Sequence, residues 1–167
     1  MLNLALAKLH APYGGIAVKG DVDDRRWTEI FAGTEILAVP GRASLKRGPV
    51  TVTALTPDDS RAPILHRPDP VVHRDGFHIV LGHAPDIALA SPPADLILAG
   101  HTHGGQVRLF GWPLLTLSKV PRAWAAGVTA LPGGGTLVVS RGIGMERRDA
   151  PRIRFLCRPQ LVVLDPG

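Results

Sequence analysis

Two histidines on a glycine-flanked turn are the residues of this sequence best suited to chemistry. His101 and His103 follow the apolar run 96–99, and glycines stand on both sides of the pair. A short apolar run bounded by turn residues predicts a buried strand, and the glycines allow the turn to direct both rings toward one point. Neutral imidazole suits Zn, Mn, Fe or Ni better than Mg or Ca. The spacing therefore favours a metal site, with a pair of polar loop residues as the alternative.

The same order of strand, glycine and ligand-type residue occurs twice more. A strand predicted at 77–81 leads to Gly82 and His83, and one predicted at 15–19 leads to Gly20 and Asp21. In layered α/β proteins, groups at the carboxyl ends of neighbouring strands converge on one crevice. We therefore expect a single cluster of nitrogen and oxygen metal ligands. Its members would be Asp21, His83, His101 and His103.

Composition describes an ordinary globular chain. With 167 residues, 45% hydrophobic and 20% charged, the chain can form one core, so we expect a single domain over 1–167. The net charge of +5 favours anionic partners such as phosphate esters, acidic headgroups or nucleic acid. The single cysteine, Cys157, excludes an internal disulfide and is expected in a buried strand. Neither a membrane span nor a signal peptide is recognisable, which predicts a cytoplasmic protein or one peripheral to the membrane.

The predicted elements that must position the ligands are mostly short strands. A helix is expected at 25–31, capped by Asp23 or Asp24, with its aromatic residues in the core. Strands between 36 and 55 are predicted to form a meander, and those between 106 and 140 a second sheet. The proline-rich stretch 56–75 is predicted to be a surface loop. Three further histidines are interpreted as non-ligands, His66 and His73 as solvated loop residues and His78 as a packed or edge residue of its strand.

Two groups of motifs make the chain resemble the calcineurin-like metallophosphoesterases. Gly82-His83 and the Gly-His-Thr-His-Gly-Gly-Gln segment 100–106 are similar to the last two metal-binding blocks of that family. The Ser-Arg-Gly-Ile-Gly segment 140–144, followed by 154–159, is similar to the ending of a bacterial branch. Members of that branch are often membrane-associated phosphodiesterases or lipid-headgroup pyrophosphatases. The resemblance implies an α/β (α+β) fold, a two-sheet sandwich flanked by helices, in which 1–167 forms the C-terminal portion of the domain and the N-terminal part of the fold is missing.

The resemblance also implies a ligand set. Family members hold two metal ions and attack phosphorus with a metal-bound hydroxide. By resemblance, Asp21, His83 and His101 would serve one ion and His103 the other. The family's Asp-x-His and Gly-Asp-x-x-Asp blocks have no counterpart here, and Val22 stands where the family has a histidine. The expectation is therefore a divalent transition metal, dinuclear in the family and a single ion here, with impaired catalysis.

A basic tail completes the candidate site. The segment 141–158 holds six arginines, which form either a solvated basic face or an anion-attracting rim with Arg141 as the best phosphate contact. The segment has no interleaved aromatic platform and no nucleic-acid motif, which argues against a nucleic-acid partner. Two functions remain. One is a metal-dependent phosphoesterase that cleaves a phosphodiester or pyrophosphate, with a lipid-headgroup or nucleotide-linked substrate. The other is a non-catalytic remnant that binds a metal or an anion.

Overall fold

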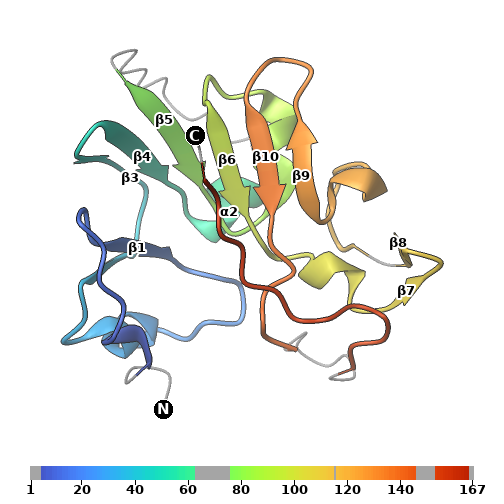
Figure 1. The fold of residues 1–167 in the computed structure, drawn as a ribbon, viewed down its shortest axis with the longest axis horizontal. Helices are drawn as coiled ribbons and strands as arrows, with labels where there is room; N and C mark the ends of the chain where they lie inside the picture. The colour runs from blue at the N-terminus through green and yellow to red at the C-terminus, as the bar shows by residue number, and fades with distance from the viewer. Residues whose placement is uncertain (1–4, 63–75, 115, 146–152, 166–167) are drawn as a thin grey trace.

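The computed structural model describes residues 5–62, 76–114, 116–145 and 153–165. Its main element is a six-stranded mixed sheet in the order β3-β4-β5-β6-β10-β9 (Figure 1). The four central strands are parallel, and the two edge strands run antiparallel to their neighbours. In spatial order the strands are β3 Ala43–Arg47, β4 Val50–Ala54, β5 Phe77–Leu81, β6 Leu96–Ala99, β10 Thr136–Val139 and β9 Gly127–Ala130. The mixed α/β fold class with few helices is confirmed.

The core lies on one face of this sheet, under two short helices. These are α2 Pro57–Arg61 and the 3-10 helix η2 Pro85–Ala90. Val80, Ile97 and Leu137 lie in line across β5, β6 and β10 and are all buried. Ile87 of η2 packs on them. Parallel strands that are covered on both faces have nearly continuous apolar sequences, which is why periodicity identified these strands.

The opposite face of the same strands is crossed by the C-terminal segment, drawn in red in Figure 1. A cavity of about 430 Å³ lies between the strands and this segment, with Leu98 and Val138 on one side and Val162 and Leu164 on the other. The segment 161–164 forms no strand. Cys157 precedes it and is buried as predicted, but it lies in irregular structure rather than in a strand.

A parallel pair of strands forms a separate two-stranded sheet. β1 Gly15–Val18 pairs with β2 Ile36–Val39, and the 3-10 helix η1 Trp27–Phe31 lies between them in sequence. Trp27 is buried, and its ring meets the Phe31 ring edge-on at 5.8 Å between centroids. The predicted cap is wrong, because the N-cap residue is Arg26 and no side chain caps the helix. The two aspartates bind turn amides instead, Asp23 that of Gly20 and Asp24 that of Arg26.

Two predicted pairings differ from the observed ones. β3 and β4 form the expected hairpin, but β2 pairs with β1 and does not continue a meander. The strands after His103 were expected in a second sheet, yet β9 and β10 extend the large one. The reason is that β10 is apolar on both faces and pairs in parallel with β6.

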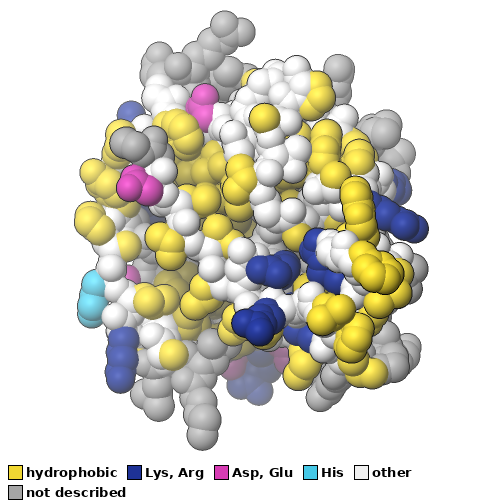
Figure 2. Space-filling model, turned by 45° about the vertical axis from the view of Figure 1, so that its right-hand side comes forward, with side chains coloured by type: hydrophobic (Ala, Val, Ile, Leu, Met, Phe, Trp, Pro, Cys, Tyr) yellow, Lys and Arg dark blue, Asp and Glu magenta, His cyan; other side chains and the backbone are white. Residues whose placement is uncertain are grey.

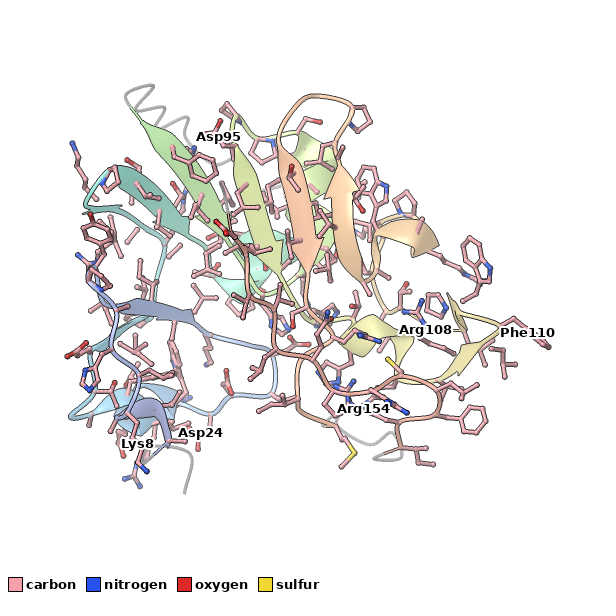
Figure 3. All side chains as sticks on the ribbon, viewed as in Figure 1. Lys8, Asp24, Asp95, Arg108, Phe110 and Arg154 are labelled. Atoms are coloured by element: carbon pink, nitrogen blue, oxygen red, sulfur yellow. The ribbon has the colours of Figure 1, made fainter. Side chains whose placement is uncertain are left out.

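A small hairpin projects from the body of the molecule. It consists of β7 Arg108–Leu109 and β8 Trp112–Pro113. Phe110 stands at its tip, 96% exposed, and points away from the sheet (Figure 3). The last short helix, η4 Arg122–Trp124, connects this region to β9. Among the described residues, no helix is long and apolar enough to cross a bilayer.

The stretch 56–75 begins with structure rather than with a loop. Thr56 caps α2 through a capping box with Asp59, and Pro57 occupies the first helical position. A box of this kind satisfies two amide donors at a helix start, and proline favours that position because it needs no donor there. His66 and His73 lie outside the described residues.

Candidate metal centre

Three of the predicted ligands meet at the carboxyl ends of β1, β5 and β6. One ligand atom each of Asp21, His83 and His101 lies within 4.8 Å of the others. His83 Nε2 lies 3.1 Å from His101 Nδ1 and also contacts Asp21 Oδ1. The strand ends place these side chains together although they come from distant parts of the sequence.

The cluster forms one wall of a cavity of about 680 Å³. His103 also lines this cavity, but it does not belong to the group of three. A metal contact of His103 stays a prediction. Other residues that line the cavity are Val22, Arg61, Ala62, Asp86, Leu117, Ser118 and Lys119.

The glycine before each ligand has a packing reason at two positions. A Cβ added at Gly20 would lie 3.2 Å from two ring atoms of His83. A Cβ added at Gly82 would lie 2.9 Å from the Cβ of Ser60 in α2, closer than such atoms approach. The missing side chains therefore let the ligand ring and the helix approach the strand ends.

The turn that carries His101 and His103 is strained and well anchored. His101, His103 and Gln106 have φ values of 64°, 49° and 53°. The left-handed region costs a residue other than glycine on the order of 1–2 kcal/mol, so surrounding contacts must hold it. Thr102, fully buried, donates to the carbonyl oxygen of Ala125 at 2.6 Å and accepts from the Gly104 amide at 3.2 Å.

Two further bonds hold the same turn to the C-terminal part of the chain. The side-chain amide of Gln106 donates to the carbonyl oxygen of Met145 at 3.0 Å. The Cys157 thiol donates to the carbonyl oxygen of His103 at 3.2 Å. A strained turn held by several contacts is common at functional sites.

The hydrogen bond of His101 and the lowered pKa of His83 both suit metal binding. His101 Nε2 lies 3.0 Å from the carbonyl oxygen of Leu117, and because a carbonyl only accepts, Nε2 carries the hydrogen. The lone pair on Nδ1 then faces the cluster, an arrangement typical of metal-binding histidines. Burial lowers the pKa of His83 and outweighs the opposing effect of the Asp21 carboxylate. The His83 ring is therefore neutral near pH 7, the form that binds a cation.

The three residues fit one divalent transition-metal ion. Asp21 Oδ1 is buried and faces His83 Nε2 at the centre of the cluster. One carboxylate oxygen and two imidazole nitrogens are a ligand set used by Zn and its neighbours, with further positions open. The donor chemistry thus agrees with the metals expected from the sequence.

Arg61 is the site residue that the sequence interpretation missed. It ends α2, its guanidinium binds Asp21 Oδ2, and its Nη2 lies 3.4 Å from His101 Nδ1. It was overlooked because it falls in the stretch interpreted as a surface loop. The signal was the capping motif at Thr56, which begins a helix that ends on Arg61.

A buried carboxylate, Asp86, also lines the cavity. Asp86 in η2 is 3% exposed and accepts hydrogen bonds from the Ser118 hydroxyl at 2.8 Å and the Lys119 amide at 2.6 Å. These bonds position the 117–119 segment against the cavity. Lys119 therefore adds a second cation to the cavity lining.

Arg141 does not line this cavity. Its Nε donates to the side chain of Gln160 at 3.1 Å, and its aliphatic carbons pack against Gly104, where an added Cβ would lie 2.6 Å from its Cγ. Its predicted contact with phosphate is therefore still a prediction, and it would require the bond to Gln160 to change.

Arg154 has a structural role in the basic tail. Its Nη2 donates to the carbonyl oxygens of Arg141, Gly142 and Gly144 at 2.8, 3.2 and 2.6 Å. Arg108 and Arg154 lie on the same side of the molecule (Figure 3). Figure 2 shows several Lys and Arg side chains beside hydrophobic ones on the face that it presents. Arg147, Arg148 and Arg152 lie outside the described residues.

His78 is a packed strand residue, as predicted. One ring nitrogen lies 2.9 Å from the Thr53 hydroxyl, and the other lies 2.9 Å from the carbonyl oxygen of Pro93. Both nitrogens are therefore used by contacts outside the cluster. His78 offers a matched control for the histidines of the cavity.

Comparison with known proteins finds several similar chains. Over 174 residues, which cover 95% of this chain and 58% of the relative, it is 29% identical to the uncharacterized metallophosphoesterase YkuE of Bacillus subtilis (strain 168). Over 103 residues, 59% of this chain and 36% of the relative, it is 33% identical to the phosphodiesterase YaeI of Escherichia coli (strain K12). An uncharacterized metallophosphoesterase of Aquifex aeolicus (strain VF5) is 35% identical over 90 residues, 53% of this chain and 32% of the relative.

The chain spans 58% or less of the length of each of these three relatives. No protein-family profile matches it. No solved structure matches it at a significant level.

Proposed function

Because this chain belongs to the calcineurin-like metallophosphoesterases, we propose that its cavity is a metal-dependent site for phosphoester hydrolysis. The observation that carries the proposal is the convergence of Asp21, His83 and His101 on a cavity that also holds Arg61 and Lys119. Metal ligands beside fixed cations suit a phosphodiester or pyrophosphate, with a lipid-headgroup or nucleotide-linked group as the finer possibilities. Residues 1–167 would then form the C-terminal portion of a phosphoesterase domain.

Each residue of the cluster has a definite task in this proposal. Asp21, His83 and His101 would hold one ion, either Mn, Zn, Fe or Ni, and His103 would face a second ion or the substrate. When bound, the ion would supply the nucleophile and neutralise phosphoryl charge. The hydrogen bond from His101 to Leu117 keeps the Nδ1 lone pair directed at the ion.

The leaving group must obtain its proton without help from position 22. Val22 lines the cavity and is 52% exposed, but its side chain has no ionisable proton to donate. A positioned general acid contributes on the order of 10² to 10⁴ in rate, mainly for poor leaving groups. We therefore expect activated esters to be hydrolysed far better than alkyl esters.

A non-catalytic site that binds a metal or an anion is the second candidate. Two observations favour it, the apolar side chain of Val22 and the single group of three metal ligands among the described residues. A three-ligand site can bind an ion and still lack the second ion and the proton donor. A non-catalytic metal site differs from the phosphoesterase in turnover, and an anion site without metal differs from it in metal content as well.

The test combines metal content with turnover. Metal-stripped protein is reloaded with Mn or Zn, and bound metal is measured for the parent, His83→Ala plus His101→Ala, and His78→Ala as the matched control. We expect about one ion in the parent and in the control, and none in the double variant. Equal metal in the double variant and the parent would exclude this cluster.

The same preparations are assayed on bis(p-nitrophenyl) phosphate and on an alkyl phosphodiester. Metal-dependent hydrolysis of the activated ester that is lost in the double variant supports the phosphoesterase. Metal binding without any hydrolysis supports the non-catalytic alternative. A turnover on the order of 10 s⁻¹ on the alkyl ester would contradict the expected impairment.

A further inference from the structure

We propose that Arg61 is a phosphate-binding residue, and that it must leave Asp21 before it can bind an oxygen of the phosphoryl group. This inference rests on the proposed function, because it places that group in the cavity beside the cluster. In this proposal two cations, the Arg61 guanidinium and the metal ion, compete for the Asp21 carboxylate.

The competition follows from where the guanidinium lies. Arg61 Nη2 binds Asp21 Oδ2 and lies 3.4 Å from His101 Nδ1. The guanidinium therefore lies between atoms that would ligate an ion. An ion held by Asp21, His83 and His101 would stand next to this positive charge. Like charges at such a separation repel strongly in a partly buried site. The guanidinium would therefore move away when an ion is bound.

The Arg61 side chain has room to move into the cavity, while its backbone is held in place. Arg61 is 37% exposed and lines the cavity of about 680 Å³. Its helix is fixed by the capping box at Thr56 and by Ser60, which is fully buried and accepts the Ala84 amide at 3.1 Å. Because Ala84 follows His83, the helix end keeps its distance from the cluster, and only the flexible part of Arg61 changes position.

The donors of Arg61 are only partly used in this position. Its Nε is buried and donates no hydrogen bond to any described residue. A buried donor without an acceptor is unfavourable, and guanidinium has a planar fork of donors that matches phosphate oxygens. Lys119 lines the same cavity, and Asp86 holds its backbone amide, so its ammonium group can contact the same oxyanion as a point charge. A phosphoryl group between the two cations would satisfy the donors that Asp21 does not.

Calorimetry with inorganic phosphate on metal-free protein tests the inference without any ion. Asp21→Asn should free the guanidinium and strengthen phosphate binding about tenfold, the equivalent of one charged hydrogen bond. Adding Arg61→Gln to this variant should abolish the gain. A gain that survives in the double variant would reflect only the lost negative charge and would overturn the proposal. No gain in Asp21→Asn would overturn it as well.

A second titration measures competition with the ion. Arg61→Gln should bind Mn²⁺ about tenfold more tightly than the parent, because no arginine must be displaced from Asp21, and its Mn-loaded form should bind phosphate about tenfold more weakly. Arg61→Ala gives a second measurement in case glutamine itself bonds to Asp21. Arg26→Gln, which removes a surface arginine paired with Glu29, is the matched control and should change neither affinity. Weaker Mn²⁺ binding in both Arg61 variants would mean that Arg61 supports the metal site, and would overturn the proposal.

The two sets of outcomes separate this inference from the proposed function. If the parent takes up no metal but the phosphate gain in Asp21→Asn depends on Arg61, the metal-dependent function is wrong and the anion site stands. If metal is bound and the gain is absent, the function stands and the role of Arg61 is wrong.

Discussion

Thr102→Val should weaken both the fold and the metal site, because Thr102 anchors the strained histidine turn. Valine has nearly the same shape but lacks the hydroxyl that bonds Ala125 at 2.6 Å and Gly104 at 3.2 Å. The substitution leaves a buried carbonyl oxygen and a buried amide without this partner, which costs about 1–3 kcal/mol in free energy of unfolding. The turn also contains two histidines in the left-handed region, at about 1–2 kcal/mol each. With its anchor lost, the turn can relax and move His101 away from the cluster.

Urea unfolding and metal titration measure the two effects. With a urea dependence of about 2 kcal/mol per molar, the loss corresponds to a midpoint lower by roughly 0.5–1.5 M. Displacement of a ligand by loss of a supporting contact should weaken metal binding about 10–100-fold. Thr102→Ser keeps the hydroxyl and should retain most of the metal affinity. An unchanged midpoint and an unchanged affinity in Thr102→Val would refute the reasoning.

Three further predictions concern protonation, the basic tail and the core. Because burial lowers the pKa of His83 below its usual 6.5, unfolded chain binds a proton that folded chain does not. The stability of the metal-free protein should therefore be fully present above pH 6.5 and decrease as the pH falls through the lowered folded-state pKa of His83. Urea midpoints measured at several pH values check this sign, and the midpoints of His83→Gln should change less with pH. Arg141→Ala should weaken phosphate binding by about 1.5–3 kcal/mol, measured by calorimetry, if Arg141 leaves Gln160 for phosphate. Arg154→Ala should lower the free energy of unfolding by about 1–3 kcal/mol, measured by urea unfolding, because it removes hydrogen bonds to three carbonyl oxygens. Equal losses of phosphate affinity in the two variants would indicate a diffuse electrostatic field and no specific contact. Ile97→Ala, at a fully buried position, should cost about 2–5 kcal/mol in urea unfolding, and a loss below about 1 kcal/mol would show that the site collapses around the cavity.

Local sequence patterns were enough to find the strands that end at the site. The apolar runs of β5 and β6 are short, are bounded by turn residues and are covered on both faces, so each could be recognised without knowledge of its neighbours. The glycine that precedes each ligand was equally visible in the sequence. It has a local cause, because a side chain at Gly20 or Gly82 would meet His83 or Ser60.

Pairing between distant strands was decided by the tertiary structure. β2 pairs with β1, and β10 pairs with β6. The residue types of these strands do not specify which strand each one pairs with. An apolar strand can pair with several others, and the choice depends on which arrangement covers the most apolar surface. The predicted second sheet after His103 failed for this reason.

The sequence by itself determined which residues could bind a metal, through the strand, glycine and ligand order at Asp21, His83 and His101. Only the tertiary structure decided that the cation beside the Asp21 carboxylate is the Arg61 guanidinium. Arg61 lies 40 residues from Asp21 in sequence, and it reaches the cluster because α2 packs beside the end of β5. Ligand chemistry belongs to residue types and can be read along the chain, whereas the electrostatic environment of a site depends on helix and strand packing that brings distant charges together.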